Sequence, residues 1–97
     1  MQSLGKIREE LKAIRYYYAR KEVFDFGGKI TGAHEVERLA IRYNDAMRSA
    51  SPWLYDLYIG LYVRNNTQES LSLEMNYSQD YIQRENKKLM QYLQSNL

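Results

Sequence analysis

The sequence predicts an all-α protein, a single domain of five helices that occupies residues 1–97. Apolar side chains recur at spacings of three and four residues along most of the chain, which is the period of amphipathic helices. No segment shows the strict alternation of a β-strand. A length of 97 residues suits one domain, and 44% hydrophobic residues are enough to build one core. We divide this domain into a helical N-terminal part, residues 1–50, and a C-terminal part, residues 52–95, that ends in two short helices.

The first predicted helix runs from Leu4 to about Val23, with Ser3 as its N-cap. Its apolar stripe has a heptad-like spacing, which leaves two alternatives. The stripe pairs with a second copy of the chain, giving a homodimer through the N-terminal helix, or it packs on later helices of the same chain. The stripe consists of Leu4, Ile7, Leu11, Ile14 and Tyr18.

A glycine-rich loop and two further helices follow. The segment Phe24–His34 holds three glycines and breaks the helical period, so we expect a hinge or a hairpin-like excursion there. It lacks the glycine spacing and the Lys-Ser/Thr pair of a phosphate loop. A second helix is predicted over Ala33–Ser49. A third begins with Ser51 as N-cap and a proline at the first helical position, has a broad apolar face typical of a central helix, and ends near Arg64.

The last two predicted helices are short, and the four-residue break MNYS separates them. Thr67 is the N-cap of the fourth helix, which ends at Met75. Asn76 can adopt a left-handed conformation at low cost. Ser78 then caps the fifth helix, which runs to about Gln94. Two helices joined by so tight a turn are typical of a helix-turn-helix.

The composition disfavours several kinds of site. The chain has no cysteine and a single histidine, His34, so we expect no metal, no cofactor and no nucleophilic catalytic centre, and hence no enzyme activity. No apolar run approaches the roughly 18 residues of a membrane span. The N-terminus lacks the apolar core of a signal peptide. We therefore expect a soluble, cytoplasmic protein without a membrane partner.

The fifth helix has a polar face that suits contact with DNA. Glutamine can bind adenine and arginine can bind guanine through two hydrogen bonds each, while aspartate can accept one from cytosine. Two lysines further along would lie near the flanking phosphates. The alternative is an ordinary solvated face. The candidate DNA-binding residues, with the two caps, are Thr67, Ser78, Gln79, Asp80, Gln83, Arg84, Lys87 and Lys88.

The charge distribution argues against a simple DNA-binding interpretation. The net charge is +2, and residues 1–22 carry six basic and three acidic side chains. Residues 62–97 carry four of each and are neutral. Because affinity for nucleic acid depends on neutralising phosphates, the basic excess lies in the wrong half of the chain for the polar helix to use by itself.

The stretch that contains the two short helices resembles the fourth region of bacterial sigma factors, a helix-turn-helix that reads a promoter element. The upstream helix PWLYDLYIGLYV adds to the resemblance, which covers residues 52–95. By position it implies that Gln79, Asp80 and Arg84 read bases, with Gln83 beside them. The chain departs from the family at Glu85, where an apolar residue normally packs. The residues in register are Thr67, Glu69, Leu71, Met75, Asn76, Tyr77, Ser78, Ile82 and Leu93.

The layout of the whole chain is similar to that of small phage-encoded proteins of Gram-positive bacteria, related to the autolysin-regulator-like regulators of late genes. This resemblance implies a DNA-binding transcription regulator of phage or prophage origin, with double-stranded DNA as its partner. The alternative is a protein-interaction module that keeps the helix-turn-helix fold and acts on a host protein such as RNA polymerase. Ten tyrosines and the neutral C-terminal half favour that alternative.

Overall fold

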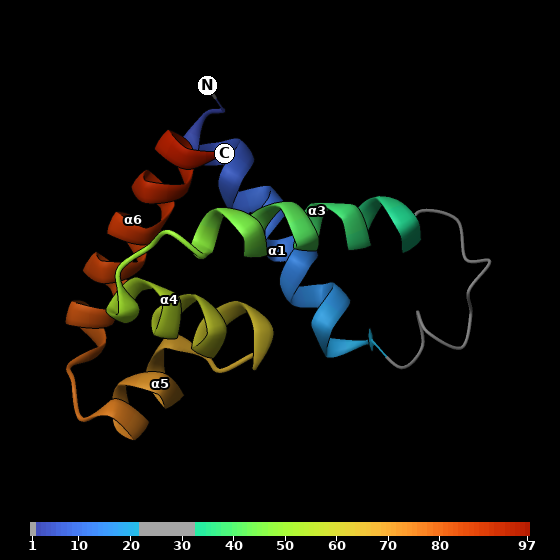
Figure 1. The fold of residues 1–97 in the computed structure, drawn as a ribbon. Coiled ribbons are helices and arrows are strands. Elements are labelled where there is room, and N and C mark those ends of the chain that lie inside the picture. Colours follow the sequence, from blue (N-terminus) through green and yellow to red (C-terminus); the bar gives the residue numbers. More distant parts are fainter. Residues whose placement is uncertain (1, 22–32) are drawn as a thin grey trace.

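A computed structural model describes residues 2–21 and 33–97, and within these ranges the chain is all-α, which confirms the predicted fold class. The described residues contain five helices, if a terminal π-turn is counted with the helix that it extends (Figure 1). Most of the predicted glycine-rich loop, residues 24–32, lies outside the described residues. The elements are α1 (Leu4–Ala19), α3 (Ala33–Met47), α4 (Pro52–Tyr58) with η1 (Ile59–Val63), α5 (Gln68–Met75) and α6 (Gln79–Asn96).

The four predicted N-caps are confirmed. In each case a hydroxyl oxygen accepts a hydrogen bond from the backbone N–H three residues later, which satisfies one of the unpaired donors at the helix start. The donor–acceptor pairs are Lys6 to Ser3 (3.1 Å), Leu54 to Ser51 (3.3 Å), Ser70 to Thr67 (2.9 Å) and Tyr81 to Ser78 (3.1 Å).

The first helix ends earlier than predicted. Arg20 leaves the helical conformation (φ −124°, ψ 28°), and its N–H is shared between the carbonyls of Tyr16 and Tyr17. Its guanidinium carbon lies 4.3 Å from the centre of the Tyr16 ring, which is a cation–π contact. The predicted end at Val23 lies outside the described residues.

The third predicted helix ends near Arg64 as expected, but its last turn is wider than an α-helix. The N–H of Arg64 donates to the carbonyl of Ile59, five residues back, at 2.8 Å. Asn65 follows with a positive φ of 61°. Arg15 of α1 donates to the side-chain and backbone oxygens of Asn65 at 3.3 and 3.4 Å, so a contact between distant segments holds this ending.

The helix formed by α4 and η1 lies at the centre of the fold. It packs against α1, α3, α5 and α6, and its Leu57, Tyr58 and Leu61 are buried. One core cluster joins residues from Ile7 to Leu93, so the two parts of the chain share a single core. The expectation of a central third helix is confirmed.

The apolar stripe of α1 is used inside the chain. Ile7, Leu11 and Ile14 are at most 1% exposed, because α1 packs against α3, η1 and α6. The side-chain amide of Gln94 also donates to the carbonyl of Gln2 at 2.9 Å and ties the start of α1 to the end of α6. The middle of the stripe therefore packs within the chain, whereas Leu4 and Tyr18 at its two ends are only partly buried.

Candidate functional site

Helix α5, of 8 residues, and helix α6, of 18 residues, are joined by a turn of three residues. Asn76 adopts the predicted left-handed conformation (φ 65°, ψ 33°). The N–H groups of Asn76 and Tyr77 both point back to the carbonyl of Ser72, which closes the end of α5. Ser78 then starts α6, so the chain reverses at once and α5 packs against α6.

One face of α6 belongs to the core and the opposite face is open to solvent. Ile82, Leu89 and Leu93 are fully buried. Every candidate residue predicted from the sequence lies at the surface. The exposed set is Thr67, Ser78, Gln79, Asp80, Gln83, Arg84, Lys87 and Lys88.

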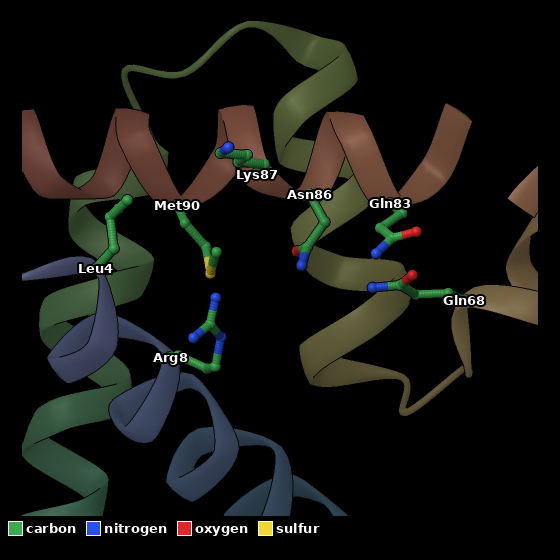
Figure 2. Close-up of a pocket in the computed structure, with 7 residues that line it drawn as sticks. All are labelled: Leu4, Arg8, Gln68, Gln83, Asn86, Lys87 and Met90. Atoms are coloured by element: carbon green, nitrogen blue, oxygen red, sulfur yellow. The ribbon is translucent and has the colours of Figure 1, made fainter. Parts of the chain in front are cut away.

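The exposed residues of α6 divide between two sides of the helix. Gln83 and Lys87 line a groove of about 330 Å³ between α6, α1 and the start of α5, which we call the α1–α6 groove (Figure 2). Lys88 lies on the other side, where its ammonium is 2.8 Å from a carboxylate oxygen of Glu85. Asp80 and Arg84 are exposed between these two sides. The other residues that line the groove are Leu4, Arg8, Gln68, Asn86 and Met90.

Glu85 is a buried acidic residue of α6, and the structure explains how its carboxylate is tolerated. Its exposed fraction is 6%. The indole N–H of Trp53 donates to Oε1 at 2.9 Å, and Lys88 Nζ lies 2.8 Å from Oε2. Both oxygens therefore have a donor, which removes most of the cost of burying them.

Trp53, which donates to this carboxylate, belongs to a cluster of three aromatic rings. Trp53 from α4 contacts Tyr77 of the turn edge to face, with ring centres 5.5 Å apart. Tyr81 of α6 lies 4.7 Å from Tyr77 and 6.0 Å from Trp53. Because one ring comes from each of α4, the turn and α6, the cluster fixes the start of α6 against the body of the protein.

The contact with Lys88, followed by that with Trp53, lowers the pKa of Glu85 below its ordinary value near 4.5. A carboxyl with a lowered pKa in the folded state stabilises the fold above its unfolded pKa, and this contribution disappears as the pH falls through the folded pKa. We therefore expect wild type to be more stable than Glu85→Gln at neutral pH, and the difference to shrink below pH about 4.5. Urea unfolding followed by Trp53 fluorescence at several pH values measures it.

Glu74→Gln is the control for this measurement, because Glu74 is an exposed acid on α5. Its stability relative to wild type should change little over the same range. A constant difference between wild type and Glu85→Gln down to pH about 3 would contradict the role given to the Glu85 carboxylate.

Sequence reasoning missed the partners that the fold brings to α6. Arg8 belongs to α1, and Gln68 is the first residue of α5. Asn86 is held in place by Tyr62, whose hydroxyl donates to its Oδ1 at 2.6 Å. No local sequence pattern predicts these contacts, since they form where α6 meets residues of α1, α5 and η1.

Comparisons of the chain with protein-family models, with curated proteins and with solved structures find no match. Among the described residues, no group of three or more His, Cys, Asp or Glu side chains is placed to hold a metal ion. No helix in residues 2–21 or 33–97 combines the length and the apolar character needed to cross a membrane.

Proposed function

We propose that this protein is a cytoplasmic, DNA-binding transcription regulator, of phage or prophage origin, that reads double-stranded DNA with α6. The observation that carries the proposal is the open face of α6 directly after the three-residue turn. Gln79, Asp80, Gln83 and Arg84 occupy the first two turns of the helix and are all exposed, while Ile82 anchors its other side in the core. A recognition helix needs this combination of polar outer face and fixed inner face.

The side chains have distinct roles in this proposal. Gln79 and Arg84 make two-hydrogen-bond contacts with base edges, and Asp80 accepts from a cytosine amino group. Thr67 and Ser78 already accept hydrogen bonds from backbone N–H groups, but each hydroxyl can still donate its own hydrogen to a phosphate. The lysines that follow add positive charge near the DNA backbone.

Replacing Arg84 by alanine tests the base-reading role. We expect wild type to bind a selected duplex with an affinity that falls as salt rises, because phosphate contacts release counterions. Arg84→Ala should lose roughly 1–3 kcal/mol on that duplex and relax the preference at one position. Fluorescence anisotropy with the selected duplex and single-position variants of it measures both effects.

Arg38→Ala is the matched control for Arg84→Ala. Arg38 is exposed near the start of α3, the end of that helix which Figure 1 shows away from α6. Its replacement should leave affinity and sequence preference unchanged. Absence of binding to any duplex at low salt would contradict the proposed function, whereas equal behaviour of Arg84→Ala and wild type would contradict only the role of Arg84.

Selection of bound sites from a random DNA pool supplies the duplex for these measurements. One recognition helix reads only a few base pairs, so specific binding usually needs two half-sites. A repeated motif at a fixed spacing would indicate that two copies bind together.

A second candidate function is an interaction with a host protein such as RNA polymerase, and exposed apolar side chains favour it. Leu73 on α5 is 76% exposed, and Tyr77 in the turn is 47% exposed. Large apolar groups at the surface often mark protein interfaces. Binding to purified RNA polymerase that is weakened by Leu73→Ser, together with no binding to duplex at low salt, would favour this function over DNA recognition.

A further inference from the structure

The α1–α6 groove has the chemistry of an anion site. Its lining includes two cations, Arg8 and Lys87, and three side-chain amides, and none of its lining residues is acidic. Figure 2 shows the side chains of Gln68 and Gln83 pointing toward each other at one end, with Asn86 extending from α6 beside them, and the guanidinium of Arg8 reaching toward Met90 at the other end. A ligand in this groove would meet hydrogen-bond donors of positive or neutral charge.

Two details orient these donors. Asn86 uses its Oδ1 to accept the hydroxyl of Tyr62 at 2.6 Å, so its amide nitrogen is the group left for a ligand. Gln68 is the first residue of α5, so the positive end of that helix dipole lies beside the groove. Both features favour an anion with several oxygen acceptors, as a phosphate has.

The position of the groove favours a phosphate of the DNA backbone. Gln83 and Lys87 belong both to the groove and to the exposed side of α6, next to Arg84. The site is therefore continuous with the face that we propose to read bases. A duplex whose major groove holds α6 has a sugar-phosphate strand alongside the helix, next to the groove that Arg8 of α1 and Lys87 of α6 both line.

We propose that the α1–α6 groove binds the sugar-phosphate backbone of DNA beside the site read by α6, and that Arg8 of α1 is a phosphate-binding residue. This inference rests on the proposed function. It gives the basic N-terminal helix a specific part in binding. It also assigns Lys87 to the phosphate on this side of α6, whereas Lys88 is held by Glu85 on the other side.

The test compares Arg8→Gln with Lys6→Gln. Both remove one positive charge from an exposed position of α1, but only Arg8 lines the groove. We expect Arg8→Gln to weaken binding to the selected duplex and to mixed-sequence duplex by the same factor, roughly three- to tenfold. The slope of log affinity against log salt should fall by about 1. Lys6→Gln should leave the slope at its wild-type value, and both variants should melt at the wild-type temperature.

The outcomes separate this inference from the proposed function. If wild type binds duplex but Arg8→Gln keeps the slope and affinity of Lys6→Gln, the groove is not a phosphate site and the proposed function stands. If Arg8→Gln changes the preferred sequence, Arg8 contacts bases and the inference is overturned. If wild type binds no duplex at low salt, the proposed function and this inference fail together.

Discussion

Replacing Leu71 by alanine should lower the free energy of unfolding by roughly 2–5 kcal/mol and should loosen α5 more than any other helix. Leu71 is 2% exposed, and the only other buried residue of α5 is Ser72. A helix of eight residues is not stable by itself in water, so its contacts with the core decide whether it forms. Urea unfolding gives the total loss, and amide hydrogen exchange locates it in α5.

Gly60 offers a second test of this contact, because it lies directly against the side chain of Leu71. A Cβ atom on Gly60 would lie 2.9 Å from one methyl carbon of Leu71 and 3.3 Å from the other. Gly60→Ala should therefore overpack the wild-type contact. In the Leu71→Ala background the same methyl group enters the cavity left by the leucine, and it should recover part of the lost stability.

A double-mutant cycle measures this compensation. We expect a favourable coupling of at least about 0.5 kcal/mol between Gly60→Ala and Leu71→Ala, the range typical of residues in contact. Gly5→Ala in place of Gly60→Ala is the control, because Gly5 is exposed in α1 and belongs to a different helix. Equal effects of Gly60→Ala in the two backgrounds would show that the contact does not hold α5 in place.

The features that the sequence predicts correctly are local ones. Each of the four helix starts depends on one hydroxyl and a backbone N–H three residues away, so the pattern in the chain already contains the whole interaction. The turn after α5 is similar, since a left-handed Asn76 followed by a capping Ser78 needs no distant partner. Solvent exposure of the polar face of α6 likewise follows from the period of the helix.

Features that depend on distant partners are not predictable in this way. The π-turn of η1 ends where Arg15 of α1 binds Asn65, fifty positions further along the chain. Glu85 interrupts the apolar pattern of α6, and a hydrogen bond from Trp53 of α4 offsets the free energy of burying its carboxylate. In both cases the residue pair is formed by tertiary packing, and neither segment alone contains a signal for the other.

The fold brings basic residues of the N-terminal helix next to the neutral C-terminal part. The neutral balance of residues 62–97 counts against DNA binding only if α6 acts alone. Packing of α1 against α6 places Arg8 in the same groove as Lys87. The basic excess of the N-terminal helix is then available beside the polar face, which supports the proposed function. The variant Arg8→Gln tests whether this charge contributes to DNA binding.

Replacing Asn44 by alanine should cost roughly 2–4 kcal/mol, because this one side chain serves two tyrosines from different helices. Its amide nitrogen donates to the hydroxyl of Tyr18 on α1 at 2.9 Å. Its Oδ1 accepts the hydroxyl of Tyr58 on α4 at 2.7 Å. Tyr58 is fully buried, and burial raises the pKa of its hydroxyl above the ordinary value, so it stays protonated and needs an acceptor.

A double-mutant cycle of Asn44 and Tyr58 tests whether this loss of stability comes from the Tyr58 hydroxyl, which Asn44→Ala leaves without its acceptor. Removing both partners of a buried hydrogen bond costs much less than removing one, since no polar group is left without a partner. Asn44→Ala should therefore destabilise the Tyr58→Phe variant less than it destabilises wild type, by about 1 kcal/mol or more in urea unfolding. Tyr77→Phe, at an exposed position of the turn before α6, is the control and should leave the cost of Asn44→Ala unchanged. Strict additivity of Asn44→Ala and Tyr58→Phe would contradict the hydrogen-bond chain, and would mean that these tyrosines fill the core through their rings alone.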